Sequence, residues 1–123
     1  MQKTINIPIF HHKIWLTDWE DAKKYVEDVS CYDALCYIGY RQRVCFCCSE
    51  IAESAIAHES LHLANFILRR CMIFVDAKED EIAAYLMQFI FEKLKPILEK
   101  ENKIKQRNKA NEKTTSTMSK KSN

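Results

Sequence analysis

Glycine is almost absent from this chain, because Gly39 is the single glycine among 123 residues. The phosphate-binding loops of Rossmann and P-loop proteins need several glycines, at which the backbone turns sharply and comes close to the phosphates. A nucleotide site of either kind is therefore excluded.

Long apolar runs are also missing. The longest uninterrupted one, Ile82 to Met87, has six residues, whereas a membrane span needs about 20. The first ten residues lack the apolar core and the small-residue cleavage site of a secretory signal. Hydrophobic residues make up 47% of the chain, charged residues 29%, and the mean hydropathy is −0.34, as in a soluble globular protein. We therefore expect a cytoplasmic protein without a membrane partner.

Six cysteines are present, but their spacing does not give the two separated C-x-x-C pairs of a thiolate zinc finger. Since no export signal is apparent, we expect the thiols to stay reduced and to pack as small apolar side chains. They are Cys31, Cys36, Cys45, Cys47, Cys48 and Cys71.

Charge is distributed unevenly. Residues 99–123 carry eight basic and three acidic side chains, a balance of +5 that leaves −3 on the rest of a chain whose total is +2. We expect residues 1–98 to form the folded domain and residues 99–123 to be a basic disordered tail. The tail has no aromatic residue that could stack on bases, so no nucleic-acid partner is expected.

Two stretches of the first half favour strands. Ile5, Ile7 and Ile9 stand at alternate positions, which predicts a strand, and Pro8 places this strand at a sheet edge. Residues 43–48 are β-branched, aromatic and free of glycine, which predicts a buried strand. Residues 30–41 are ambiguous, and a short helix that ends at Gly39 is one interpretation.

Three longer helices are predicted. Residues 17–20 form a capping box from Thr17 to Glu20, which opens a helix to about Asp28. The inward side chains of that helix are Trp19, Ala22 and Val26. Residues 49–70 lack glycine and proline and are apolar all round their second half, which predicts a central, buried helix.

The third helix follows an extended connector at 71–75. Asp76, with Glu79 three positions on, forms a cap for this helix, which runs to about Leu94. Pro96 is expected to break or kink it.

The buried helix contains the motif His58-Glu59-Ser60-Leu61-His62. Residues four apart share one helix face, so both imidazoles can point at one metal ion. Glu59 lies about 100° further round the helix, beside the metal, where it can take a proton from bound water. Bound Zn²⁺ would also offset the cost of burying these polar groups. The alternative is a pair of core histidines bonded to backbone carbonyls, with Glu59 paired to an arginine.

A zinc site needs a third protein ligand, and the acidic residues 79–81 begin 17 residues after His62. The chain rises about 12 Å from His62 to Arg70, and seven extended residues reach about 23 Å, enough to return beside the motif. Glu81 is the first candidate and Glu79 the next. Acidic residues in a first turn, however, stabilise any helix N-terminus without binding metal.

The pattern Ala57-His58-Glu59-x-x-His62, followed by Asp80-Glu81-x-x-Ala84-Tyr85, resembles small zincin-like metallopeptidase domains of the gluzincin type, of the kind found in phage and prophage proteins. The resemblance covers roughly residues 4–95. It implies an α+β, minimal zincin-like fold, in which a small mixed sheet packs on the H-E-x-x-H helix and on a following helix that bears a ligand.

The resemblance also implies a set of roles. Zn²⁺ is the cofactor, His58, His62 and Glu81 are its ligands, and Glu59 is the general base. Tyr85, one turn beyond Glu81, is a candidate for stabilising the oxyanion, although a packed tyrosine is the commoner role for such a residue.

We therefore predict a zinc metallopeptidase that acts on a peptide or protein substrate held along an edge strand. The alternative is a catalytically inactive, zinc-stabilised structural or interaction protein, such as a phage component in the host cytoplasm or the virion. A metal-free helical adaptor with a basic tail is a third hypothesis. Glu59 favours the first, because a structural zinc needs no base.

Overall fold

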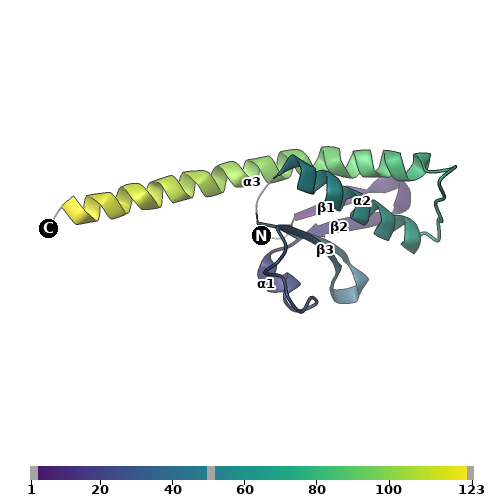
Figure 1. The fold of residues 1–123 in the computed structure, drawn as a ribbon, viewed down its shortest axis with the longest axis horizontal. Coiled ribbons are helices and arrows are strands. Elements are labelled where there is room, and N and C mark those ends of the chain that lie inside the picture. Colours follow the sequence, from purple (N-terminus) through teal and green to yellow (C-terminus); the bar gives the residue numbers. More distant parts are fainter. Residues whose placement is uncertain (1–2, 50–51, 122–123) are drawn as a thin grey trace.

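The computed structural model describes residues 3–49 and 52–121 and combines a four-stranded mixed sheet with α-helices (Figure 1). This confirms the α+β class and the small mixed sheet. The elements are β1 (Lys3–Ile7), η1 (Pro8–Phe10), β2 (His12–Leu16), α1 (Trp19–Ala22), β3 (Ala34–Ile38), η2 (Tyr40–Gln42), β4 (Val44–Cys48), α2 (Glu53–Arg70) and α3 (Glu81–Lys121).

The sheet has the strand order β1-β2-β4-β3. β1 runs antiparallel to β2, β2 parallel to β4, and β4 antiparallel to β3. β4 is an inner strand, and its first four residues are buried, as expected for a strand covered on both faces. The prediction of a buried strand at 43–48 is therefore confirmed. An N-terminal edge strand is also present, but it ends at Ile7, and Ile9 of the predicted strand lies in η1.

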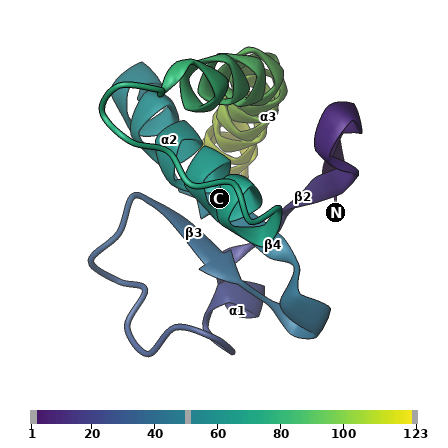
Figure 2. The ribbon, with the colours of Figure 1, turned by 90° about the vertical axis from the view of Figure 1, so that its right-hand side faces the viewer.

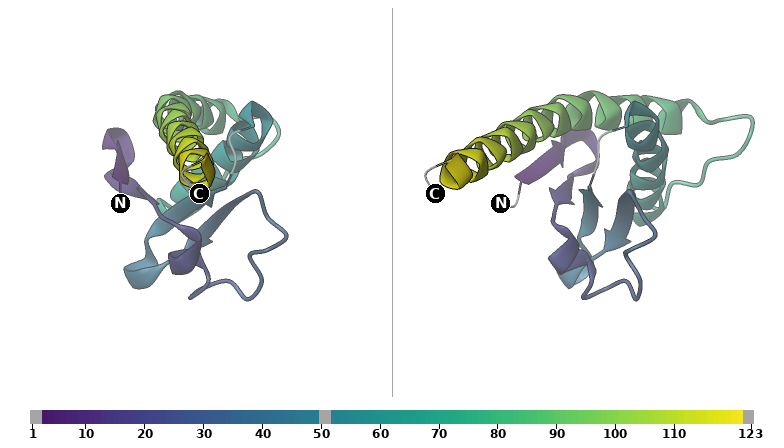
Figure 3. Two further views of the ribbon diagram at one scale, coloured as in Figure 1. Left: turned by 90° about the vertical axis from the view of Figure 1, so that its left-hand side faces the viewer. Right: turned by 60° about the vertical axis from the view of Figure 1, so that its left-hand side comes forward.

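The helices divide between the two faces of the sheet. α2 and α3 cover one face, while α1 and the segment 23–33 lie on the other (Figure 2). Within the helical layer, α2 lies beside β3 and β4, and α3 passes over β1 (Figure 3). The larger core lies under α2 and α3, and its strand residues are Ile5, Ile7, Ile14, Leu16, Val44 and Phe46.

The first helix differs from its prediction. α1 ends at Ala22, and its N-cap is Asp18, whose carboxylate accepts a hydrogen bond from the Asp21 amide at 2.9 Å. The hydroxyl of Thr17 instead bonds to the hydroxyl of Tyr37 on β3. Because the Thr17 hydroxyl is bonded to Tyr37, it does not cap the helix as the capping box predicted. The smaller core on this face does include the three side chains that were expected to point inward, which are Trp19, Ala22 and Val26.

The interpretation of residues 30–41 as a helix is wrong, because Ala34–Ile38 forms β3 and pairs along its whole length with β4. Leu35 and Tyr37 face one core, and Cys36 and Ile38 face the other. Gly39 follows at the turn, where a Cβ atom would lie 2.9 Å from the Cys45 sulfur. Pairing with β4 overrides the weak local preference for helix.

α2 is confirmed as a long helix, although it begins at Glu53, after the extended N-cap residue Ala52, and residues 50–51 of the prediction lie outside the described residues. The prediction that it is buried all round is wrong. Its buried side chains lie on one face, against the sheet and α3, while Leu61 is 45% exposed. Only part of the apolar surface of this helix has a partner.

The segment before α3 also differs from its prediction. The carboxylate of Asp76 accepts hydrogen bonds from the amides of Lys78 and Glu79, at 2.8 and 2.9 Å. These bonds close a turn inside the connector, and α3 begins later, at Glu81.

α3 contains Pro96 in its interior and continues to Lys121, so neither the predicted end near Leu94 nor the disordered tail is observed. Leu94 and Leu98, on either side of the proline, are both buried, and their packing holds the helix across it. Beyond them Lys, Arg, Glu, Gln and Ala propagate the helix without an interrupting glycine or proline. This half of α3 projects away from the sheet (Figure 1).

Among the described residues, no helix combines the length and the apolar character that crossing a membrane requires.

We predict that a chain ending at Lys100 keeps its stability. It loses the ion pair of Lys3 with Glu101 (3.2 Å), a half-exposed contact that contributes at most about 1 kcal/mol. Side chains from Lys103 to Ser116 are exposed. Urea unfolding of both chains measures the difference in the free energy of unfolding.

A chain that ends at Lys93 is the matched control. It lacks the buried Leu94 and Leu98 as well, and should lose more than about 2 kcal/mol. A loss of that size in the chain ending at Lys100 would show that the projecting helix belongs to the folded domain.

Candidate functional site

The rotation of α2 places the three polar residues of H-E-x-x-H in two different environments. Ile56, Leu63 and Ile67 are buried against the core, and each residue advances about 100° round the helix. Glu59 therefore lies at the margin of the buried face, and it is 9% exposed. His58 and His62 lie further round, and both are exposed.

The two imidazoles meet as predicted. Their Nε2 atoms form a hydrogen bond of 3.2 Å, in which either ring can be the donor, and the ring centroids are separated by 4.9 Å. Two nitrogens at adjacent corners of a tetrahedral zinc site, with Zn–N bonds of about 2.0 Å, are separated by about 3.3 Å. The pair thus has the spacing of two zinc ligands.

Glu59 is held by a residue that the sequence analysis did not single out. The thiol of Cys36, on β3, donates a hydrogen bond to Oε2 of Glu59 at 2.8 Å, and the thiol also lies 3.5 Å from the Glu59 carbonyl oxygen. Burial raises the pKa of the Cys36 thiol, and the hydrogen bond and charge of Glu59 raise it further. Cys36 therefore stays protonated and serves as a hydrogen-bond donor.

These groups share one pocket. It has a volume of about 310 Å³ and lies between α2 and the edge strand β3. The polar groups are His58, Glu59, His62 and the Cys36 thiol, and the other lining residues are Tyr32, Ala34, Leu35 and Phe66. The site therefore lies beside a sheet edge, although this edge is β3 and not the N-terminal strand.

The structure does not bring Glu81 or Glu79 to the histidines. Both are exposed, and α3 contacts α2 on the face that contains Ala57, where a shallow pocket is shared with Ala84 and Phe91. Within residues 3–49 and 52–121, no three His, Cys, Asp or Glu side chains are grouped closely enough to hold a metal ion. The donor set in this conformation therefore fits two corners of a zinc site.

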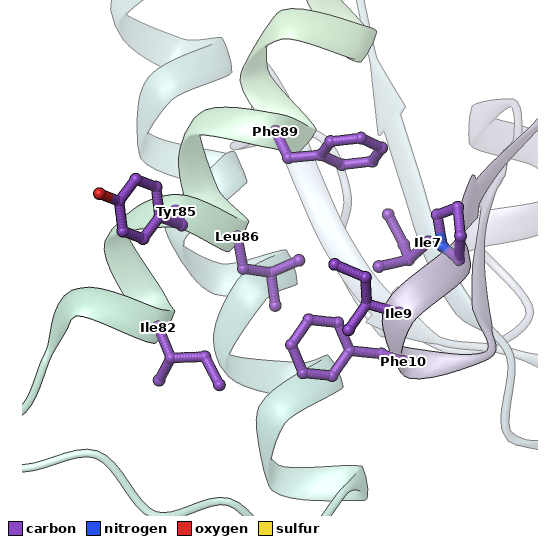
Figure 4. Close-up of a pocket in the computed structure, with 8 residues that line it drawn as sticks. Ile7, Ile9, Phe10, Ile82, Tyr85, Leu86 and Phe89 are labelled. Atoms are coloured by element: carbon purple, nitrogen blue, oxygen red, sulfur yellow. The ribbon is translucent and has the colours of Figure 1, made fainter.

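Tyr85 lies at a different pocket. This apolar pocket, of about 580 Å³, lies between η1 and the first turns of α3. Figure 4 shows Ile9 and Phe10 on one side and Leu86 and Phe89 on the other, with the Tyr85 hydroxyl pointing away from them. Tyr85 is 69% exposed and does not line the histidine pocket.

All six cysteines are free, and Cys31 is exposed instead of packed as a small apolar side chain. Four of them lie on β3 and β4, and only Cys36 contacts the site. Its position could have been predicted only with β3 recognised as a strand, because the alternation along that strand turns Cys36 towards α2.

No protein-family model, curated protein or solved structure matches this chain.

We predict that Cys36→Ala destabilises the fold by about 1–3 kcal/mol, because the buried Glu59 carboxylate loses its donor. Cys36→Ser keeps a hydroxyl donor and should lose less. Urea unfolding at neutral pH gives the free energies of unfolding.

Cys48→Ala is the matched control, since Cys48 is a half-buried thiol packed against the same core. It removes a similar volume without touching Glu59. Equal losses for Cys36→Ala and Cys48→Ala would contradict a role for the thiol–carboxylate hydrogen bond.

Proposed function

We propose that this chain is a zinc-dependent metallopeptidase in which His58 and His62 bind the metal and Glu59 is the general base. The separation of 3.2 Å between the two Nε2 atoms is the observation that carries the proposal. A zinc ion bound there would lower the pKa of a bound water towards 7 and polarise a carbonyl group.

Glu59 is suited to the role of base by its position. It follows His58 directly, and its carboxylate lines the same pocket as both imidazoles. The hydrogen bond from Cys36 occupies Oε2 and leaves the other oxygen to accept a proton from water. The carboxyl group would then pass this proton to the leaving amine.

The surroundings of the pocket favour an extended peptide as substrate. β3 is an edge strand, and an edge strand can hold a peptide by backbone hydrogen bonds. Tyr32, before β3, and Phe66, on α2, offer apolar surface to a substrate side chain. A peptide bound along β3 would pass in front of the two imidazoles.

The identity of the third ligand remains a prediction from the sequence, with Glu81 first and Glu79 next. Neither lies at the histidine pair in this conformation. The second candidate function is a zinc-stabilised structural or interaction protein without turnover, which would need two further ligands besides the histidine pair. A structural protein would not need Glu59 as a base, whereas a peptidase would, so replacing Glu59 distinguishes the two functions.

Glu59→Gln tests the proposal. With excess zinc, the wild-type chain should cleave members of an unbiased peptide library, and the variant should cleave about 10²–10⁴ times more slowly. Bound zinc should be unchanged, because the amide leaves both imidazoles in place. Stability should be equal or slightly higher, since a buried charge is removed.

Glu53→Gln is the control on the same helix, because Glu53 is exposed and paired with Lys95 away from the pocket. It should retain full cleavage, whereas His58→Ala should lose both zinc and cleavage. Equal cleavage by wild type and Glu59→Gln would disprove the mechanism. Zinc binding without cleavage of any library member would favour the structural protein.

A further inference from the structure

We propose that a second pocket, on the face of the sheet that carries α1, binds a nucleotide, with the base against aromatic rings and the phosphate on Arg43. The pocket has a volume of about 250 Å³. Ligand sites generally have volumes of about 300–1,000 Å³, so this one suits a single ring and not a large cofactor. The inference uses no residue of the histidine pocket and is independent of the proposed hydrolysis. The lining residues are Trp15, Thr17, Asp21, Lys24, Tyr25, Tyr40, Arg43 and Cys45.

The alternation of β2 and β4 brings Trp15 and Arg43 together. Ile14 and Leu16 belong to the core under α2, so Trp15, between them, faces the other side of the sheet. β4 runs parallel beside β2, and its first residue, Val44, also belongs to the core under α2. Arg43 therefore faces the same side as Trp15. Its guanidinium carbon lies 3.9 Å from the centroid of the Trp15 ring.

The guanidinium of Arg43 has no acidic partner in the part of the chain that the structure describes. The ion pairs there all involve lysines, and Arg43 is half-buried. Stacking on Trp15 uses the flat face of the guanidinium and leaves its N–H edge available. This edge is a rigid fork of donors that binds a phosphate through two parallel hydrogen bonds.

The charge of the pocket favours an anion. Lys24 and Arg43 are the basic side chains that line it, and Asp21 is the acidic one. The Asp21 carboxylate accepts a hydrogen bond from the Tyr37 hydroxyl at 2.6 Å and lies 3.7 Å from Nζ of Lys24. A cationic ligand, of the kind that aromatic cages bind, would meet two like charges here.

Aromatic rings supply the contact for a base. Tyr25 is 42% exposed and Tyr40 is 61% exposed, so both rings offer surface to a ligand. Stacking of a base on such rings contributes to binding whatever the base is. Asp21 adds a hydrogen-bond acceptor, which suits the amino group of cytosine. A nucleotide combines all three features, namely a ring, an amino donor and a phosphate.

The turn that carries Tyr40 is strained. Arg41 and Gln42 have φ angles of 53° and 61°, in the left-handed region that favours glycine. A hydrogen bond of 2.8 Å from the Gly39 amide to the Arg43 carbonyl closes this turn. Strain of this kind is common at binding sites, where the surrounding structure holds it. The hairpin thus fixes Tyr40 and Arg43 before a ligand arrives.

The pocket differs from the basic tail, which has no aromatic residue and from which no nucleic-acid partner is expected. Here the fold brings aromatic and basic side chains together from β2, α1 and the residues after it, η2 and β4. The same chemistry is offered by a free mononucleotide and by one unit of a single-stranded nucleic acid. Their relative affinities distinguish these two sources.

Calorimetric titration of the full-length chain with cytidine monophosphate tests the inference. We expect one nucleotide for each chain, with an affinity that falls as salt rises, because the phosphate contact is an ion pair. In NMR spectra the side-chain signals of Trp15 and Arg43 should shift, while those of His58 and His62 stay unchanged. Absence of binding would overturn the inference. Equal affinity for cytidine, inorganic phosphate or benzoate would also overturn it, since each lacks part of the nucleotide.

Two variants connect the binding to the pocket. Tyr40→Ala removes an exposed ring and should weaken binding about tenfold. Tyr85→Ala is its matched control, because Tyr85 is 69% exposed and lies outside this pocket. Arg43→Gln should reduce the affinity for cytidine monophosphate to that for cytidine, whereas Arg69→Gln, at an exposed arginine of α2, should follow the wild type. Unchanged affinity in Tyr40→Ala would overturn the inference even where Arg43→Gln fails to fold.

A short single-stranded oligocytidylate identifies the source of the nucleotide. Binding tighter than that of cytidine monophosphate, and weakened by Tyr40→Ala, supports a unit of a nucleic acid. Binding that is equal or weaker supports a free nucleotide. Tighter binding that Tyr40→Ala leaves unchanged would place the nucleic acid elsewhere and overturn the assignment to this pocket.

Discussion

The rotation of α2 about its axis is the constraint on which the site depends. Ile56, Ser60, Leu63 and Ile67 are all buried, and together they fix one face of the helix against the sheet and α3. Because an α-helix turns by about 100° per residue, this face determines the direction of every other side chain. No separate interaction is needed to point His58 and His62 towards solvent.

The same rotation separates the carboxylate from the imidazoles. Glu59 enters the interface with β3, where the Cys36 thiol is its donor, and the histidines remain accessible. A base held in a largely buried position by a neutral donor is oriented before any substrate arrives. Accessible ligands can receive an ion or a substrate. The proposed function follows from this division between a buried base and exposed ligands.

The sequence predicts those features that arise within one element. The i, i+4 spacing predicts that His58 and His62 meet, since both lie on one helix. The composition of residues 43–48 predicts a strand that is buried on both faces. Pro8 predicts an edge, although the proline follows β1 and begins η1.

Features that depend on distant partners could not be predicted in the same way. β3 forms because β4 lies beside it, and the Thr17 hydroxyl leaves the N-cap position because Tyr37 is within reach. The exposed face of α2 also follows from packing, since apolar residues alone cannot show which of them find a partner. For the same reason, the distance in sequence from His62 to Glu81 did not determine the face of α2 on which α3 packs.

The central claim is that His58 and His62 bind zinc together, and NMR of the imidazole nitrogens tests it most directly. Zinc added to the metal-free chain should shift the Nε2 resonances of His58 and His62 at the same zinc concentration, while those of His11 and His12 stay unchanged. Unchanged resonances of the motif pair, or shifts confined to His11 and His12, would contradict the account.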